Sequence, residues 1–132
     1  MLKPELSTFE ICLGIDFGTK RIGLAVSQNG LISPLPYLNS GPLLFLKISE
    51  IIQQYKIGKV YVGLSTGPLR RLQLDFVSKL SDMIKLSVET VDETATTIEA
   101  QAMLKANGHS KKSHRRLVDS VSAALILERV IC

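Results

Sequence analysis

One short run near the start of the chain constrains the fold more than any other stretch. Between Ile11 and Phe17 every residue except Asp16 is apolar or glycine. Such a run is typical of a central β-strand that is covered on both faces. A carboxylate there is costly unless a cation or hydrogen bonds compensate its charge. We therefore expect Asp16 either to bind a cation or to accept hydrogen bonds from nearby amides.

Three glycines surround this acid in the sequence, at positions 14, 18 and 23. They remove side chains around Asp16, which lets a backbone or a ligand come close. The tripeptide Gly18-Thr19-Lys20 has the composition of a tight turn. It predicts a hairpin into a second strand over Arg21–Ser27, antiparallel to the first.

The rest of the pattern predicts alternating strands and helices. Leu31–Leu38 contains Pro34 and Pro36, which cannot donate ladder hydrogen bonds, so we expect it at a sheet edge. The hydrophilic segment Gly108–Ser113 is expected to be a loop. The other expected elements are a helix with Pro42 at its first position that runs up to Gly58, a strand over Lys59–Leu64, a helix over Leu69–Ile84, a strand over Ser87–Val91, a helix from the Thr96/Glu99 capping box to Asn107, and a last helix from about His114 to Val130.

Length and composition narrow the class of protein. With 132 residues, 45% hydrophobic and only 5% aromatic, the chain is expected to form one domain, residues 1–132, with an aliphatic core. Its two cysteines have neither metal-ligand spacing nor a disulfide framework, which favours a reducing, cytoplasmic compartment. No apolar stretch is long enough to cross a membrane. The net charge of +4 permits nucleic-acid binding without demonstrating it.

Two further carboxylates stand where expected elements meet. Glu93 follows the strand that ends at Val91, and Asp119 lies early in the last helix. If Asp16, Glu93 and Asp119 came together, their repulsion would require divalent cations between them, and Mg²⁺ or Mn²⁺ suits carboxylate oxygens. Such ions support phosphodiester hydrolysis. Alternatively, Asp119 complements a helix dipole and Glu93 is a solvated loop residue.

A series of motifs runs along the chain in a fixed order. They are Gly14–Ser27, Val62–Leu64, Val91–Glu93, Thr96-Thr97, Glu99-Ala100, Val118–Ser120 and Ala123-Ala124. Together they resemble the YqgF-type family, which has an RNase H-like fold and is described as nucleases of pre-16S ribosomal RNA or as Holliday-junction-resolvase-like proteins. The resemblance implies an α/β domain with a mixed five-stranded sheet in the order 3-2-1-4-5 and helices on both faces. It also implies that Asp16, Glu93 and Asp119 are the metal-binding catalytic acids.

The chain departs from the family pattern at two places. Thr94 stands where the family usually has arginine, and the loop Ser65–Arg71 lacks the usual acid. Arg70 and Arg71 are candidates to replace the missing guanidinium. The expected nucleic-acid-binding residues are basic side chains beside the acids, namely Lys20, Arg21, Arg70, Arg71, Lys111, Lys112, Arg115 and Arg116. A merely solvated charged loop is the alternative for the last four.

These observations predict a metal-dependent endonuclease that binds nucleic acid and not a membrane. Structured RNA, a ribosomal RNA precursor, is the favoured substrate, with a four-way DNA junction as the alternative. A second alternative is a catalytically weak nucleic-acid-binding module, which the departure at Thr94 favours. Asp16–Thr19 also resembles the first phosphate loop of actin-like ATPases and sugar kinases, but those proteins close two such domains over ATP, and this chain has room for one.

Overall fold

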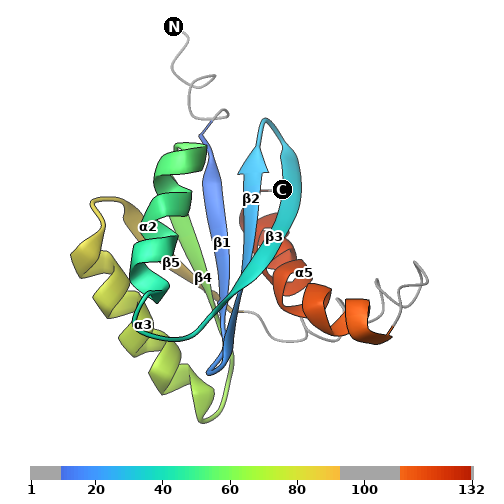
Figure 1. Ribbon diagram of the computed structural model, residues 1–132. Coiled ribbons are helices and arrows are strands. Elements are labelled where there is room, and N and C mark those ends of the chain that lie inside the picture. Colours follow the sequence, from blue (N-terminus) through green and yellow to red (C-terminus); the bar gives the residue numbers. More distant parts are fainter. Residues whose placement is uncertain (1–9, 93–110, 132) are drawn as a thin grey trace, which may run out of the picture.

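The computed structural model describes residues 10–92 and 111–131, the latter with side chains from Ser120 to Val130 (Figure 1). Five strands form one sheet in the order β3-β2-β1-β4-β5. The expected order is therefore confirmed. The strands are β1 (Cys12–Phe17), β2 (Arg21–Gln28), β3 (Leu31–Asn39), β4 (Lys59–Leu64) and β5 (Ser87–Asp92). The helices are α2 (Leu44–Tyr55), α3 (Leu69–Met83) and α5 (Lys111–Ile131).

The strand directions follow from the connections between them. The hairpin at Gly18 makes β1 and β2 antiparallel, while the helical crossovers make β4 parallel to β1 and β5 parallel to β4. A side chain at Gly18 would place its Cβ 2.7 Å from the Arg21 carbonyl oxygen, so only glycine fits this turn. The carboxyl ends of β1, β4 and β5 consequently meet at one edge of the sheet.

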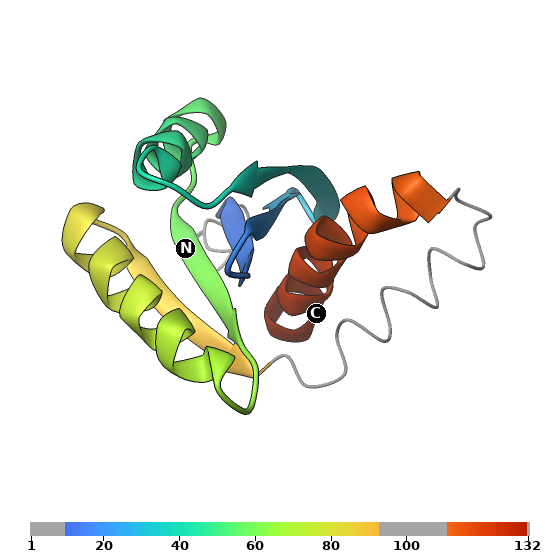
Figure 2. The same cartoon turned by 60° about the horizontal axis from the view of Figure 1, so that its bottom comes forward.

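Helices cover both faces, as expected. Figure 2 shows α2 and α3 on one side of the sheet and α5 on the other. On the α2 and α3 side, alternate residues of the inner strands, among them Leu13, Ile15, Leu24 and Val62, pack with Phe76 of α3 in the main apolar core. On the α5 side, a smaller core joins Cys12 and Ala25 to Ala123, Ala124 and Leu127.

Gly14 explains how close α5 comes to the sheet. A Cβ on this residue would lie 2.8 Å from the Ala123 carbonyl oxygen and 2.7 Å from Leu127 Cγ. The helix backbone thus rests directly on β1. Farther along α5 toward its start, the Ser120 hydroxyl donates a hydrogen bond to the Leu35 carbonyl oxygen and fixes the helix on β3.

The edge strand β3 carries a bulge. Ile22 pairs with Leu38 and Leu24 pairs with Leu35, so two residues of β3, Pro36 and Tyr37, stand opposite Gly23 alone. Leu35 and Leu38 both pack into the main core although they are three residues apart. The extra residue permits this, because regular alternation would place them on opposite faces.

Predicted boundaries of two helices are wrong. Helix α2 begins at Leu44, so Pro42 precedes the helix, and it ends at Tyr55, where Lys56 takes a left-handed conformation (φ 56°). Helix α5 already includes Lys111–Ser113, which were expected to be loop. Lysine is a good helix former, so hydrophilicity alone did not mark a loop there. The predicted helix from Thr96 to Asn107 lies outside the described residues.

Candidate nucleic-acid interface

Asp16 is placed by the alternation of β1. Its neighbours Ile15 and Phe17 both pack into the core beneath α2 and α3, so the Asp16 side chain points to the α5 face, where it is half-buried. Its partner across β2 is Gly23, which offers no side chain. The expected acid therefore stands on a face of the sheet, near the carboxyl end of a central strand.

Gln73 ties this strand end to the neighbouring one. The side chain of Gln73, in α3, is fully buried, and its Nε2 donates to the Phe17 carbonyl oxygen at 3.2 Å. Its Oε1 accepts hydrogen bonds from the Ser65 backbone N–H at 2.8 Å and from the Ser65 hydroxyl at 3.1 Å. One amide thus links the residue after Asp16 to the first residue after β4. Sequence reasoning missed Gln73 because a polar residue in an amphipathic helix is normally solvated; only the fold shows its burial.

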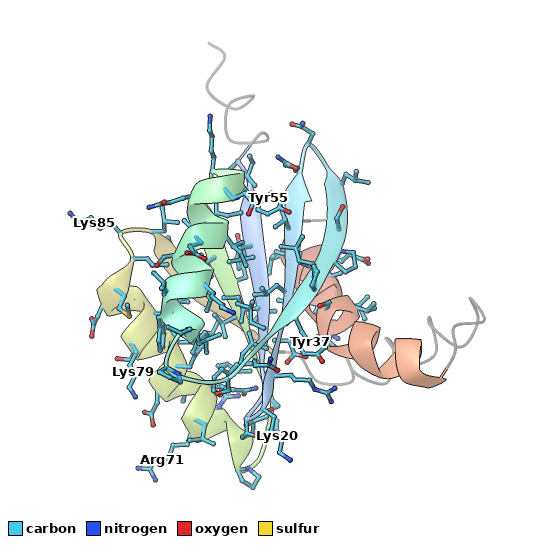
Figure 3. The ribbon with its side chains drawn as sticks, viewed as in Figure 1. Lys20, Tyr37, Tyr55, Arg71, Lys79 and Lys85 are labelled. Atoms are coloured by element: carbon cyan, nitrogen blue, oxygen red, sulfur yellow. The ribbon has the colours of Figure 1, made fainter. Side chains whose placement is uncertain are left out.

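Four of the predicted basic residues lie at the same end of the sheet. Lys20 is in the β1–β2 turn, Arg21 opens β2, and Arg70 and Arg71 are in the first turn of α3. Figure 3 shows Lys20 and Arg71 projecting from the lower end of the molecule. Arg70 Nη1 is 3.7 Å from Asp92 Oδ1, an exposed pair that contributes little to stability.

Arg21 also contacts an aromatic ring. Its guanidinium carbon lies 5.4 Å from the centre of the Tyr37 ring, within cation–π range. Both side chains are half-buried. Sequence reasoning missed Tyr37 as well, because only the bulge in β3 brings it to this side of the sheet.

The other two predicted acids are described less fully. Asp119 lies in α5, one residue before the Ser120 anchor and about one turn before Ala123, which rests on Gly14. Glu93 lies outside the described residues; the residue before it, Asp92, ends β5, and its carbonyl oxygen accepts a hydrogen bond from Arg129 of α5. The predicted basic residues Lys111, Lys112, Arg115 and Arg116 occupy the first turns of α5.

The chemistry of the described donors fits a hard cation better than a covalent mechanism. The carboxylate of Asp16 is the kind of oxygen ligand that Mg²⁺ prefers. Among residues 10–92 and 120–130, no three acidic, histidine or cysteine side chains cluster as a metal site. Burial raises the pKa of the Cys12 thiol, with the nearby Glu10 charge adding to the effect, so the thiol stays protonated and is a poor nucleophile.

Solved structures define the class of fold. The chain superposes on Thermus thermophilus RuvC, solved in complex with a Holliday junction substrate, with a TM-score of 0.59 and 16% identity over 90% of this chain and 92% of that one. The fowlpox virus resolvase, solved with Holliday junction DNA, gives a TM-score of 0.55 and 12% identity over 92% and 96%. The fold is therefore that of the RNase H-like resolvases.

Sequence comparison then identifies the family. Residues 10–132 match the family model RuvX, described as Holliday junction resolvase. A protein of Maridesulfovibrio salexigens named "Putative pre-16S rRNA nuclease" is 33% identical over 127 residues, covering 88% of this chain and 93% of the relative. A protein of the same name from Bacillus thuringiensis is 30% identical over 128 residues, with the same coverage. The chain belongs to the RuvX family, whose members are hydrolases of nucleic acids. This confirms the predicted resemblance.

Proposed function

We propose that this protein is a metal-dependent endonuclease that cuts the precursor of 16S ribosomal RNA. The observation that carries the proposal is the half-buried Asp16 carboxylate on the α5 face, at the strand end where Lys20, Arg21, Arg70 and Arg71 gather. Basic side chains there would hold a phosphate backbone, and the carboxylate would hold a cation against it. The names of the curated relatives support the same conclusion, and family membership supports hydrolysis of nucleic acid in general.

Three carboxylates would form the reactive centre. Asp16, Glu93 and Asp119 would be the ligands, with Mg²⁺ or Mn²⁺ as the bound ion. Support for Asp119 comes from the placement of α5, since its anchors at Ser120 and Ala123 hold this part of the helix over β1 and β3. Bound divalent cations supply a water nucleophile and stabilise the charge on the leaving oxygen.

The described residues would do the remaining work. Lys20, Arg70 and Arg71 are exposed and can reach phosphate oxygens along a strand, which positions the substrate without reading its sequence. Gln73 keeps Phe17 and Ser65 at a fixed separation, and therefore keeps Asp16 in register with the basic loop that follows β4. Geometry held in this way needs no rearrangement at the moment of reaction.

A second candidate function is the resolution of four-way DNA junctions. The family description and the two junction-bound structural neighbours favour it. Resolution needs two symmetric cuts and hence a pair of identical sites, whereas trimming an RNA strand needs one. We prefer the RNA precursor because a single site suffices for it.

One experiment separates these functions. End-labelled precursor RNA and a labelled four-way junction are incubated in parallel with the protein and Mg²⁺, with EDTA as the control. We expect Mg²⁺-dependent cuts in the RNA, and we expect the Asp16→Asn variant to cut at least about 100-fold more slowly while it keeps its fold. Paired symmetric nicks in the junction with intact RNA would select the second function. Binding without any cleavage, unaffected by Asp16→Asn, would indicate a binding module.

A further inference from the structure

We propose that the Arg21–Tyr37 pair is a stacking platform for one nucleotide of the bound strand, next to the Asp16 carboxylate. The inference rests on the proposed function and adds to it a subsite for a nucleobase. The basic residues alone do not imply such a subsite, because a basic surface binds the phosphate backbone without contacting bases.

The platform lies in one row with Asp16. Helix α5 covers the row formed by Gly14 and its partner Ala25, as the contacts of Gly14 with Ala123 and Leu127 show. The next row on this face, one step toward the carboxyl end of β1, contains Asp16, then Gly23, then the bulged residues of β3. That row lies one step beyond the row on which Ala123 and Leu127 of α5 rest.

The bulge turns Tyr37 toward the acid's side of the sheet. Because Leu35 and Leu38 both pack beneath α2, the two residues between them face the other way, with Gly23 and Asp16. Pro36 has no N–H to give to the ladder, which accounts for the bulge at this point. Bulges recur beside active sites, where they redirect a side chain.

The spacing suits one nucleotide. Asp16 and Tyr37 are two strands apart, about 10 Å at the usual strand separation. Gly23 of β2 stands between them and contributes no side chain of its own. A phosphate at Asp16 would thus place the base of an adjoining nucleotide over Tyr37.

The chemistry of the pair suits a base of any identity. Aromatic rings and guanidinium planes are the two groups on which proteins stack unpaired bases. Tyr37 and Arg21 are in cation–π contact and each keeps part of its surface exposed. Contact with Arg21 restrains the ring, so stacking a base on it costs less rotational freedom. The selectivity would be for an unstacked base, in single-stranded RNA or DNA, over a base held in a duplex.

The chain offers a matched control. Tyr61 of β4 makes a similar contact, with Lys59 Nζ 5.3 Å from its ring centre. That pair is at the opposite end of the strand from the basic residues, and Lys59 is also bound to Glu89 at 2.7 Å, which together with Tyr61 raises the pKa of Lys59. Tyr61 is half-buried, as Tyr37 is. Its removal should disturb packing comparably but leave nucleic-acid binding unchanged.

The test measures affinity for a single-stranded oligonucleotide that carries the fluorescent base 2-aminopurine at successive positions. Asp16→Asn protein is used, so that no strand is cut. We expect strong quenching at one position, about 5- to 100-fold weaker binding for Tyr37→Leu, near-normal binding for Tyr37→Phe, and no change for Tyr61→Leu. Replacing the quenched base by an abasic site should weaken binding by the protein that retains Tyr37. On that abasic strand, the Tyr37→Leu variant should bind as tightly as the protein that retains Tyr37.

Each result decides the matter. If no position is quenched, or if Tyr37→Leu weakens binding equally on every abasic strand, the platform does not exist. Should Tyr37→Leu fail to fold, the abasic scan with the intact ring still answers the question. Cleavage is measured separately with Asp16 restored. If one base is quenched but nothing is cut, the platform exists and the proposed nuclease function is wrong. If the strand is cut but no base is quenched, the nuclease function is supported and the platform does not exist.

Discussion

At the scale of single residues, Asp16 and Gln73 differ in how far they could be predicted. Asp16 could be singled out in the sequence as a candidate because a carboxylate inside an apolar strand demands an explanation. Gln73 could not be predicted in this way, because its burial depends on how α3 packs against β1 and β4. The bulge that redirects Tyr37 is likewise a product of strand pairing, although Pro36 hinted at an irregularity.

A first prediction concerns Gln73. Replacing it with leucine keeps a similar volume but leaves the Phe17 carbonyl and the Ser65 N–H without their partner in a buried place. We expect the free energy of unfolding, measured by denaturant titration, to fall by about 1–3 kcal/mol, with kcat reduced more than KM is raised. The exposed Gln54 of α2 provides the control, because Gln54→Leu should change stability by less than about 0.5 kcal/mol. Equal stability of the two variants would show that the hydrogen bonds of Gln73 to Phe17 and Ser65 do not stabilise the fold.

At the scale of elements, the sequence predicted the strands well. The strands β1, β2 and β4 are bounded by turn residues and have the apolar or β-branched composition of a covered sheet, so their predicted ends lie close to those observed. Helix ends were harder. Pro42 is suited to a first helical turn, yet the helix starts only at Leu44, because capping preferences are weak beside the geometry of the preceding turn.

The contact of α5 with Gly14 supports a second prediction. Gly14→Ala would place its Cβ 2.8 Å from a helix carbonyl oxygen, which cannot rotate away, so the helix must shift. We expect the free energy of unfolding to fall by about 1–3 kcal/mol, measured by denaturant titration. If Asp119 belongs to the site, cleavage should fall further than the decrease in stability explains.

The control for this substitution is Gly58→Ala. Its nearest neighbours would be atoms of the flexible Glu10 side chain, at 3.0 Å and beyond, which can move aside. We expect Gly58→Ala to change melting and cleavage much less than Gly14→Ala. Similar effects of the two variants would mean that the close approach of α5 has no special cost.

At the scale of the whole molecule, sheet order and the two covered faces followed from the sequence because each helix between strands dictates a parallel crossover. The assembly of the site did not follow to the same extent. Local sequence patterns placed the acids at strand and helix ends. They could not predict the hydrogen bonds of Gln73 or the alignment of Asp16, Gly23 and Tyr37 across β1, β2 and β3.

Within residues 10–92 and 111–131, no helix is long and apolar enough to span a membrane.

A third prediction concerns the distribution of charge over the molecule. Arg70→Gln with Arg71→Gln should weaken binding to nucleic acid of any sequence. It should also flatten the plot of log affinity against log salt, by about one unit for every phosphate that the variant no longer binds. The control removes two other lysines, Lys79 and Lys85, which Figure 3 shows on the α3 side of the molecule, with Lys85 well above Lys79. An equal change of slope in both double variants would mean that charge acts without regard to position.

The two prolines of β3 have a consequence for how copies of this protein meet. An unprotected sheet edge invites a strand from another chain, and such pairing leads to aggregation. Pro34 and Pro36 interrupt the regular row of backbone donors in this strand, and the bulge bends the strand between Leu35 and Leu38. The β3 edge is therefore closed to strand addition. Any pairing of two copies has to use a surface other than this edge.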